Sequence, residues 1–222
     1  MKFELFIFLI SAIFVAKGQE ATYSLSEATK LHLLKLVEGV TFMSERAAEI
    51  LQNVEFQMKS FNSSANMNLT EVHTKISKVL DDVSSNKEYK KCIDRERMQL
   101  RFILQKARAD VNQCLRAGII RGQVLRNNTI QPLLGIRLNH FIQKCFVHEK
   151  NECTEQEAAV VKEEAQLAIK MAYDNLYKAG GELKPLANKV LQCLRNIDER
   201  TKSQAKSFLD ATMKRNARQQ LN

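Results

Sequence analysis

Residues that interrupt helices are scarce in this chain of 222 residues, which has two prolines, seven glycines and no tryptophan. So few turn-forming residues favour long helices joined by short connections. No stretch alternates apolar and polar residues as a half-buried strand does. After the first eighteen residues there is also no apolar run of about 20 residues, the length that a membrane-spanning helix needs. These absences predict an all-α protein without a transmembrane segment.

The first eighteen residues, MKFELFIFLISAIFVAKG, have a basic start followed by an apolar block that is too short to span a bilayer. Ala16 and Gly18 then place small residues at the two positions that a signal peptidase reads. This pattern predicts a signal peptide over 1–18, cleavage before Gln19 and a secreted, extracellular protein. The remaining 19–222 are enough for a single helical domain with a hydrophobic core.

A regular spacing of apolar residues predicts the first helix. Ser24 and Glu27 form a capping box, and after them apolar residues recur at alternating spacings of three and four over about four heptads. Such a pattern is typical of coiled-coil or antiparallel helices that pack along a seam. The seam residues are Leu33, Val37, Val40, Ala47, Leu51, Val54, Met58 and Phe61.

Turn and capping signals divide the rest of the chain into further helices. Beyond Arg200 the apolar period thins, so we expect a frayed, basic C-terminal end over about 201–222. The pattern as a whole predicts an elongated, disulfide-stapled bundle of five to six helices. The helix starts and ends are placed at Gly118, Pro132, Thr154–Glu157, Gly180–Gly181 and Pro185. After the first helix, which ends at residue 61, the expected helices cover 68–83, 87–117, 132–148, 154–179 and 185–200.

Five cysteines in an extracellular protein are disulfide candidates. Cys92 and Cys114 would share one helix and lie about 33 Å apart, far beyond the roughly 7 Å limit between the α-carbons of bonded cysteines. We therefore predict two disulfides, with these two cysteines not joined to each other. Either Cys145 and Cys153 close a turn, or bonds tie the third and last helices to this corner, and the odd thiol is free and buried or intermolecular. The candidates are Cys92, Cys114, Cys145, Cys153 and Cys193.

Three Asn-X-Ser/Thr sequences begin at Asn62, Asn68 and Asn127. Such sequences accept N-linked glycans in secreted proteins when they lie on exposed backbone. Each falls where the helical period lapses. We therefore expect a glycoprotein with surface connections near 62–70 and 127–129.

The chain is basic, with a formal net charge of +9, and its most basic segment lies in the expected third helix. A positive charge favours anionic partners such as membranes or glycans, and secretion argues against nucleic acid. The alternative is that these charged side chains only keep the surface of the helix hydrated and bind no partner. The candidate interaction face consists of Lys90, Lys91, Arg95, Arg97, Arg101 and Arg108.

Catalytic motifs are absent: the chain has no CxxC, HExxH, GxSxG, P-loop or glycine-rich dinucleotide turn. Histidines and cysteines gather over 140–153, but at 100° per residue His140 would point about 140° away from Cys145. Secretion also favours disulfides over a zinc site of Cys and His. We therefore expect no enzyme, no metal and no cofactor.

The signal-like start, the helical domain of about 200 residues, the scattered helix-borne cysteines and the glycosylation sequences together resemble the insect secreted family named after the tsetse EP protein. The resemblance covers nearly all of 19–222. It implies an extracellular protein of gut, saliva, reproductive tract or haemolymph, with no established reaction. It also implies that the five cysteines include the family's disulfide cysteines.

Two classes of function fit these observations. The first is a non-enzymatic binding module that presents its basic face to an unknown protein or an anionic surface. The second is an extracellular carrier that encloses a lipid or another small apolar ligand. A cavity of several hundred cubic ångströms would favour the carrier, whereas a filled core with an exposed apolar patch would favour the binding module.

Overall fold

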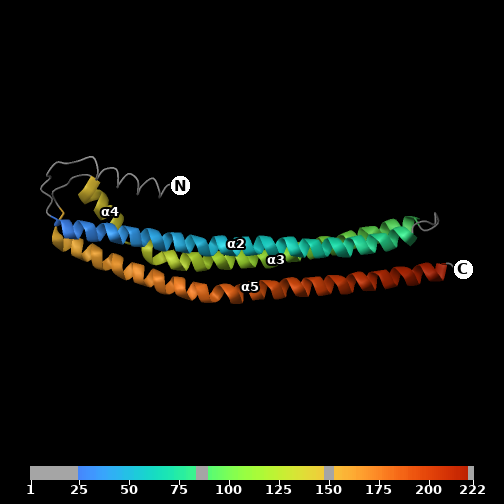
Figure 1. Ribbon diagram of the computed structural model, residues 1–222. Coiled ribbons are helices and arrows are strands. Elements are labelled where there is room, and N and C mark those ends of the chain that lie inside the picture. Colours follow the sequence, from blue (N-terminus) through green and yellow to red (C-terminus); the bar gives the residue numbers. More distant parts are fainter. Residues whose placement is uncertain (1–24, 84–89, 148–152, 220–222) are drawn as a thin grey trace. The chain divides into compact units, whose positions relative to one another are not determined.

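A computed structural model describes residues 25–83, 90–147 and 153–219 (Figure 1). Within these residues the chain is all-α, as predicted, and has no strand. The proposed signal peptide and its cleavage before Gln19 lie outside the described residues. The elements are α2 (Glu27–Val83), α3 (Lys90–Leu134), α4 (Leu138–Ile142), the π-helical segment η2 (Gln143–Val147) and α5 (Glu155–Gln219).

The chain divides into two compact units, and each long helix contributes a part to both of them. Unit 1 combines the chain up to Ala48 with Asn127–Tyr177. Unit 2 combines Glu49–Arg126 with Lys178–Asn222. Each unit has its own hydrophobic core.

Unit 1 packs the first part of α2 against α4, η2 and the first part of α5. Buried residues on α2 recur at heptad spacing, but Leu36 and Met43 are buried although we did not predict them, and the predicted Val37 is only half-buried. α5 contributes mainly small residues, which let two helices approach closely. A Cβ atom on Gly39 would lie 3.0 Å from Ile169 on α5. The facing residues are Leu33, Leu36, Val40, Met43 and Ala47 on α2 and Ala158, Val161, Ala165, Ala168 and Ala172 on α5.

Two helices of unit 1 have N-terminal caps, one at the predicted residues and one two residues later than predicted. Thr154 and Glu157 form the predicted capping box of α5, because the Glu157 amide donates to the Thr154 hydroxyl at 3.1 Å and the Thr154 amide donates to the Glu157 carboxylate at 3.4 Å. In α2 the cap is Ser26, whose hydroxyl accepts the Thr29 amide at 3.2 Å. The predicted cap, Ser24, lies two residues earlier and outside the described residues.

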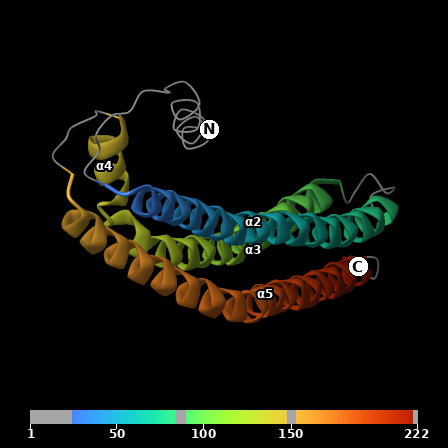
Figure 2. The ribbon, with the colours of Figure 1, turned by 60° about the vertical axis from the view of Figure 1, so that its left-hand side comes forward.

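Unit 2 packs three helices around one core (Figure 2). Gly122, late in α3, packs against Val54 of α2. Arg97, early in α3, pairs with Asp81 near the end of α2. These contacts make α2 and α3 antiparallel. The Cys114–Cys193 bond and the ion pairs of α3 with α5 make α5 antiparallel to α3 in the same way.

Buried positions in unit 2 recur every eleven residues. On α5 they include Ala179, Val190, Thr201 and Thr212, and the hydroxyls of the two threonines donate to the carbonyls four residues before them, at 2.7 and 2.9 Å. An eleven-residue repeat corresponds to about 3.7 residues per turn, close to an undistorted α-helix, and not to the 3.5 of a heptad coiled coil. The predicted heptad seam therefore describes unit 1, whereas unit 2 follows the longer repeat.

Three predicted helix breaks are wrong, because the helices continue through them. Over 62–70, Asn66 donates to the Asn62 side chain at 2.8 Å and Thr70 donates to the Asn66 carbonyl at 2.8 Å, so these polar side chains bond within the helix. Gly118 is buried in the core instead of ending α3. Gly180 and its neighbour are helical within α5. The described residues accordingly contain four α-helices where we predicted five to six.

Both prolines lie inside helices, although we predicted that each would begin one. Pro132 has no amide hydrogen to donate to the carbonyl of Asn128, four residues earlier. The Asn175 side chain of α5 donates to that carbonyl at 2.9 Å instead. A tertiary contact therefore replaces the missing helical bond.

α5 also continues through the segment beyond residue 200 that we expected to fray. Phe208 and Thr212 are buried there. Arg215 donates to the carboxylate of Glu96 at 2.7 Å, and only 1 % of the Glu96 side chain is exposed. The Glu96 carboxylate of α3 thus binds the last described turns of α5.

Candidate functional site

Two disulfides join the helices in the structure, as predicted. Cys114 of α3 bonds Cys193 of α5, with α-carbons 6.2 Å apart, and Cys145 bonds Cys153 across the connection between η2 and α5, with α-carbons 5.8 Å apart. Cys92 and Cys114 lie on the same helix and are not joined to each other. The side chain of Cys92 lies outside the described part of the structure. Cys193 is exposed.

The three glycosylation sequences all lie on helices, although we predicted surface connections. Asn62 and Asn68 are half-buried on α2, whereas Asn127 is exposed on α3. Glycosylation at these sites stays a prediction.

The six predicted basic residues do not form one face of α3. Arg97 is engaged, because its guanidinium lies 2.5 Å from Asp81 and 3.6 Å from Asp94. Arg101 and Arg108 share its side of the helix, while Arg95 projects about 140° from Arg108 at 100° per residue. Arg95, Arg101 and Arg108 are exposed, whereas Arg97 is half-buried. The side chains of Lys90 and Lys91 lie outside the described part.

Two large apolar residues stand exposed between the basic residues that remain. Met98 is 70 % exposed and Phe102 is 69 % exposed, one helical turn apart. By helical angle they lie between Arg101 on one side and Arg95 and Lys106 on the other. Arg95, Met98 and Phe102 also line a shallow hollow on this helix. We call the set Arg95, Met98, Arg101, Phe102 and Lys106 the α3 patch.

The charges of the α3 patch are not neutralised in the described part of the chain. None of Arg95, Arg101 and Lys106 has an ion pair or hydrogen bond there. Two of these cations, Arg95 and Arg101, were predicted from the sequence, whereas the apolar pair Met98 and Phe102 was not. The sequence pattern does indicate this pair, because Met98 and Phe102 interrupt the polar side of an otherwise amphipathic helix.

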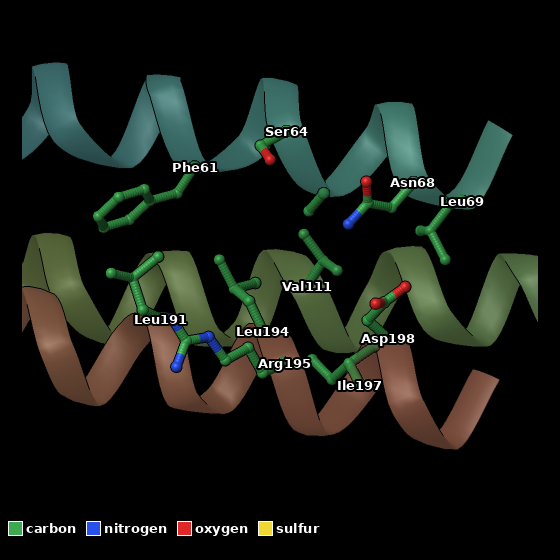
Figure 3. A pocket seen from close by; sticks show the side chains of 11 residues that line it. Phe61, Ser64, Asn68, Leu69, Val111, Leu191, Leu194, Arg195, Ile197 and Asp198 are labelled. Atoms are coloured by element: carbon green, nitrogen blue, oxygen red, sulfur yellow. The ribbon is translucent and has the colours of Figure 1, made fainter. Parts of the chain in front are cut away.

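A second feature of unit 2 is a half-open pocket of about 230 Å³ between α2, α3 and α5. Figure 3 shows Phe61 and Asn68 reaching from α2, and Arg195 and Asp198 from α5. Most of the lining is apolar. The lining residues are Phe61, Ser64, Ala65, Asn68, Leu69, Val111, Leu191, Leu194, Arg195, Ile197 and Asp198.

The charges in this pocket are unevenly matched. Lys202 donates to one carboxylate oxygen of Asp198 at 2.7 Å, and this hydrogen bond and the nearby negative charge raise the pKa of Lys202. The other oxygen, Oδ1, is buried and has no hydrogen-bond partner among the described residues. Arg195 also has no partner in the described ranges. The acid is therefore compensated by Lys202, and the arginine is not.

Neither a metal centre nor a membrane span is found in the described residues. They contain no cluster of three or more His, Cys, Asp or Glu that could hold a metal ion. Among them, no helix combines the length and the apolar character that crossing a bilayer requires.

Compared with known proteins, the chain matches no family model, no curated protein and no solved structure. The resemblance to the tsetse EP family stays a prediction.

Proposed function

We propose that this protein is a secreted, non-enzymatic binding module and that the α3 patch attaches it to an anionic lipid surface. The single observation that carries the proposal is the pair Met98 and Phe102, which stand exposed on a folded helix between cations that have no partner in the described part of the chain. A large apolar side chain left in water on a stable helix marks an interaction surface when others accompany it.

The composition of the α3 patch favours a lipid surface over a glycan. Lysine and arginine near an anionic leaflet each contribute about 1 kcal/mol to binding. A sulfated glycan would satisfy the cations but offers nothing apolar for Phe102. A basic helix face that also carries aromatic and aliphatic residues is typical of helices that lie in the lipid headgroup region.

Co-sedimentation with vesicles tests the proposal. The protein should bind mixed phosphatidylcholine and phosphatidylserine vesicles, bind pure phosphatidylcholine vesicles weakly, and lose binding as the salt concentration rises. The double variant Arg95→Gln and Arg101→Gln should weaken binding by about 30-fold, the equivalent of about 2 kcal/mol for two charges.

The matched control removes two other surface arginines of unit 2. Arg121 pairs with Glu182 and Arg200 pairs with Asp110, so Arg121→Gln with Arg200→Gln changes the net charge equally but leaves the α3 patch intact. If both double variants lose affinity equally, net charge explains the binding and the patch does not. If neither vesicle binds, the lipid proposal is wrong and a protein partner with an acidic rim becomes the better explanation.

A carrier is the second candidate, because unit 2 contains the pocket between α2, α3 and α5. The pocket volume of about 230 Å³ is smaller than the several hundred cubic ångströms expected of a carrier. Together with the exposed α3 patch, this size supports attachment as the main function.

A further inference from the structure

The pocket in unit 2 has an apolar interior and a polar edge (Figure 3). Phe61, Val111 and Leu194 come from three different helices and give it walls suited to an alkyl chain or a ring. Its polar groups are Ser64 and Asn68 on α2 and Arg195 and Asp198 on α5. Pockets of this kind orient an apolar ligand through a few polar contacts.

The charged residues of the pocket determine which headgroup such a ligand could carry. One oxygen of Asp198 accepts a hydrogen bond from Lys202, so the negative charge is paired within the protein, and the other oxygen, Oδ1, has no hydrogen-bond partner among the described residues. Arg195 contributes a guanidinium with no partner among the described residues. An anionic headgroup would pair with this guanidinium, which binds carboxylates in a planar, two-pronged geometry. An ammonium headgroup would meet an uncompensated positive charge.

The volume limits the length of the apolar part. A cavity of about 150 Å³ lined by apolar side chains accommodates benzene, with its six carbons. By proportion, about 230 Å³ takes about nine non-hydrogen atoms. A medium-length alkyl chain fits this space, whereas a long-chain lipid would extend out of the open side.

We infer that this pocket is a binding site for a medium-chain anionic amphiphile, whose alkyl chain contacts Phe61, Val111 and Leu194 and whose carboxylate binds Arg195. The site is independent of the α3 patch, since the two share no residue. Failure of one inference therefore leaves the other untouched.

Three probes with the same chain and different headgroups test this inference: octanoate, 1-octanol and octylammonium. Isothermal titration calorimetry on the full chain should rank their affinities in that order. Methyl resonances of Val111 and Leu194 should shift on addition of octanoate, which locates the ligand. No binding of octanoate, or shifts confined to other residues, would overturn the inference. Tightest binding of octylammonium would do so as well, by assigning the headgroup to Asp198.

Two substitutions on α5 separate the guanidinium from general charge. Arg195→Gln should weaken octanoate binding by about five- to tenfold, since it removes one charge-assisted contact, and should leave 1-octanol unaffected. Lys206→Gln is the matched control, because Lys206 is exposed on the same helix and does not line the pocket. Equal losses in the two variants would overturn the role of Arg195.

A third substitution tests the apolar part. Ala65→Leu adds side-chain volume at the pocket wall. It should weaken octanoate and 1-octanol alike, with the helical content of the protein unchanged by circular dichroism. Unchanged affinity for both probes in a folded Ala65→Leu variant would place the alkyl chain elsewhere and contradict the inference.

Discussion

Glu155, the first residue of α5, binds two donors from the start of α2. Its carboxylate accepts the Ser26 amide at 2.5 Å and the Thr29 hydroxyl at 2.7 Å. The bond from the Ser26 amide is the main cause that lowers the pKa of Glu155 below its ordinary value of 4.5, and the bond from Thr29 adds to it. One carboxylate therefore holds two helix starts of unit 1 together.

The sign of this pKa shift determines the pH dependence that we predict. Because the pKa is lower in the folded protein, the ionised carboxylate stabilises the fold above its unfolded pKa, and the stabilisation is lost as the pH falls through the folded value. Glu155→Gln should therefore lower the thermal unfolding midpoint at pH 7, and the difference from the wild type should shrink below about pH 4.

The control for this prediction is Glu163→Gln, which changes an exposed glutamate of the same helix in the same unit. It should have little effect at either pH. A loss in Glu155→Gln that is equally large at pH 7 and at pH 3 would show that the ionised carboxylate is not the cause.

At the scale of helices, two glycines illustrate why local signals mislead. Gly122 and Gly180 are both helical, yet a Cβ atom on Gly122 would lie 2.9 Å from a methyl group of Val54, whereas nothing lies within 4 Å of the corresponding position at Gly180. Gly122 is therefore required by the close approach of α2 and α3. No close contact requires a glycine at position 180, and Gly180 therefore only lowers the stability of α5.

Alanine substitutions should accordingly have opposite effects at these two positions. Gly180→Ala should stabilise the protein by about 0.5–1 kcal/mol, because alanine loses less backbone entropy in a helix. Gly122→Ala should destabilise it by about 1–2 kcal/mol, because Val54 must shift to accommodate the methyl group. Chemical denaturation measures both. A stabilising Gly122→Ala would mean that the two helices are not in close contact.

Helix type and core stripes were predictable from the sequence, but helix lengths were not. Apolar periodicity reflects which side of a helix is buried, so the spacing from Leu33 to Met58 identified that side of α2. Individual positions differ, because Leu36, Met43 and Ile50 are buried although we did not predict them, whereas the predicted Val37 and Leu51 are only half-buried. The breaks at Gly118 and Pro132 failed, because each residue is accommodated by a partner distant in sequence: Val190 and Met58 surround the first, and Asn175 satisfies the carbonyl that the second leaves unpaired. Such contacts depend on tertiary packing, which single-residue signals do not contain.

At the scale of the whole molecule, the two disulfides close chain segments of very different length. Cys114 and Cys193 are 79 residues apart in the sequence, and Cys145 and Cys153 are eight apart. A cross-link removes more entropy from the unfolded chain when it closes a longer loop. The first bond also ties two helices of unit 2, whereas the second closes a short connection in unit 1.

Replacing each bonded pair with serine should therefore give unequal losses of stability. Cys114→Ser with Cys193→Ser should lower the free energy of unfolding by about 3–4 kcal/mol, and Cys145→Ser with Cys153→Ser by about 2 kcal/mol. Urea denaturation of both double variants under oxidising conditions gives the comparison. A larger loss in the second double variant would contradict this ranking.

The candidate site was only partly predictable at this scale. The basic segment of α3 was visible in the sequence, but Arg97 was assigned to an open face although it pairs with Asp81, a residue of another helix. The pocket between α2, α3 and α5 was not predicted at all, because its lining comes from three helices whose register only the fold defines. The division into two units likewise lacks a local signal in the three continuous helices.

The attachment of the α3 patch to anionic lipid is tested most directly by tryptophan fluorescence, since the chain has no tryptophan of its own. Phe102→Trp places one reporter in the patch, and Phe56→Trp places another at a residue of α2 that is 74 % exposed and outside the patch. With phosphatidylserine-containing vesicles, we predict that the emission of Phe102→Trp shifts to shorter wavelength as the indole enters the headgroup region, while that of Phe56→Trp does not. An unchanged emission of Phe102→Trp, or an equal shift at both positions, would contradict the proposed function.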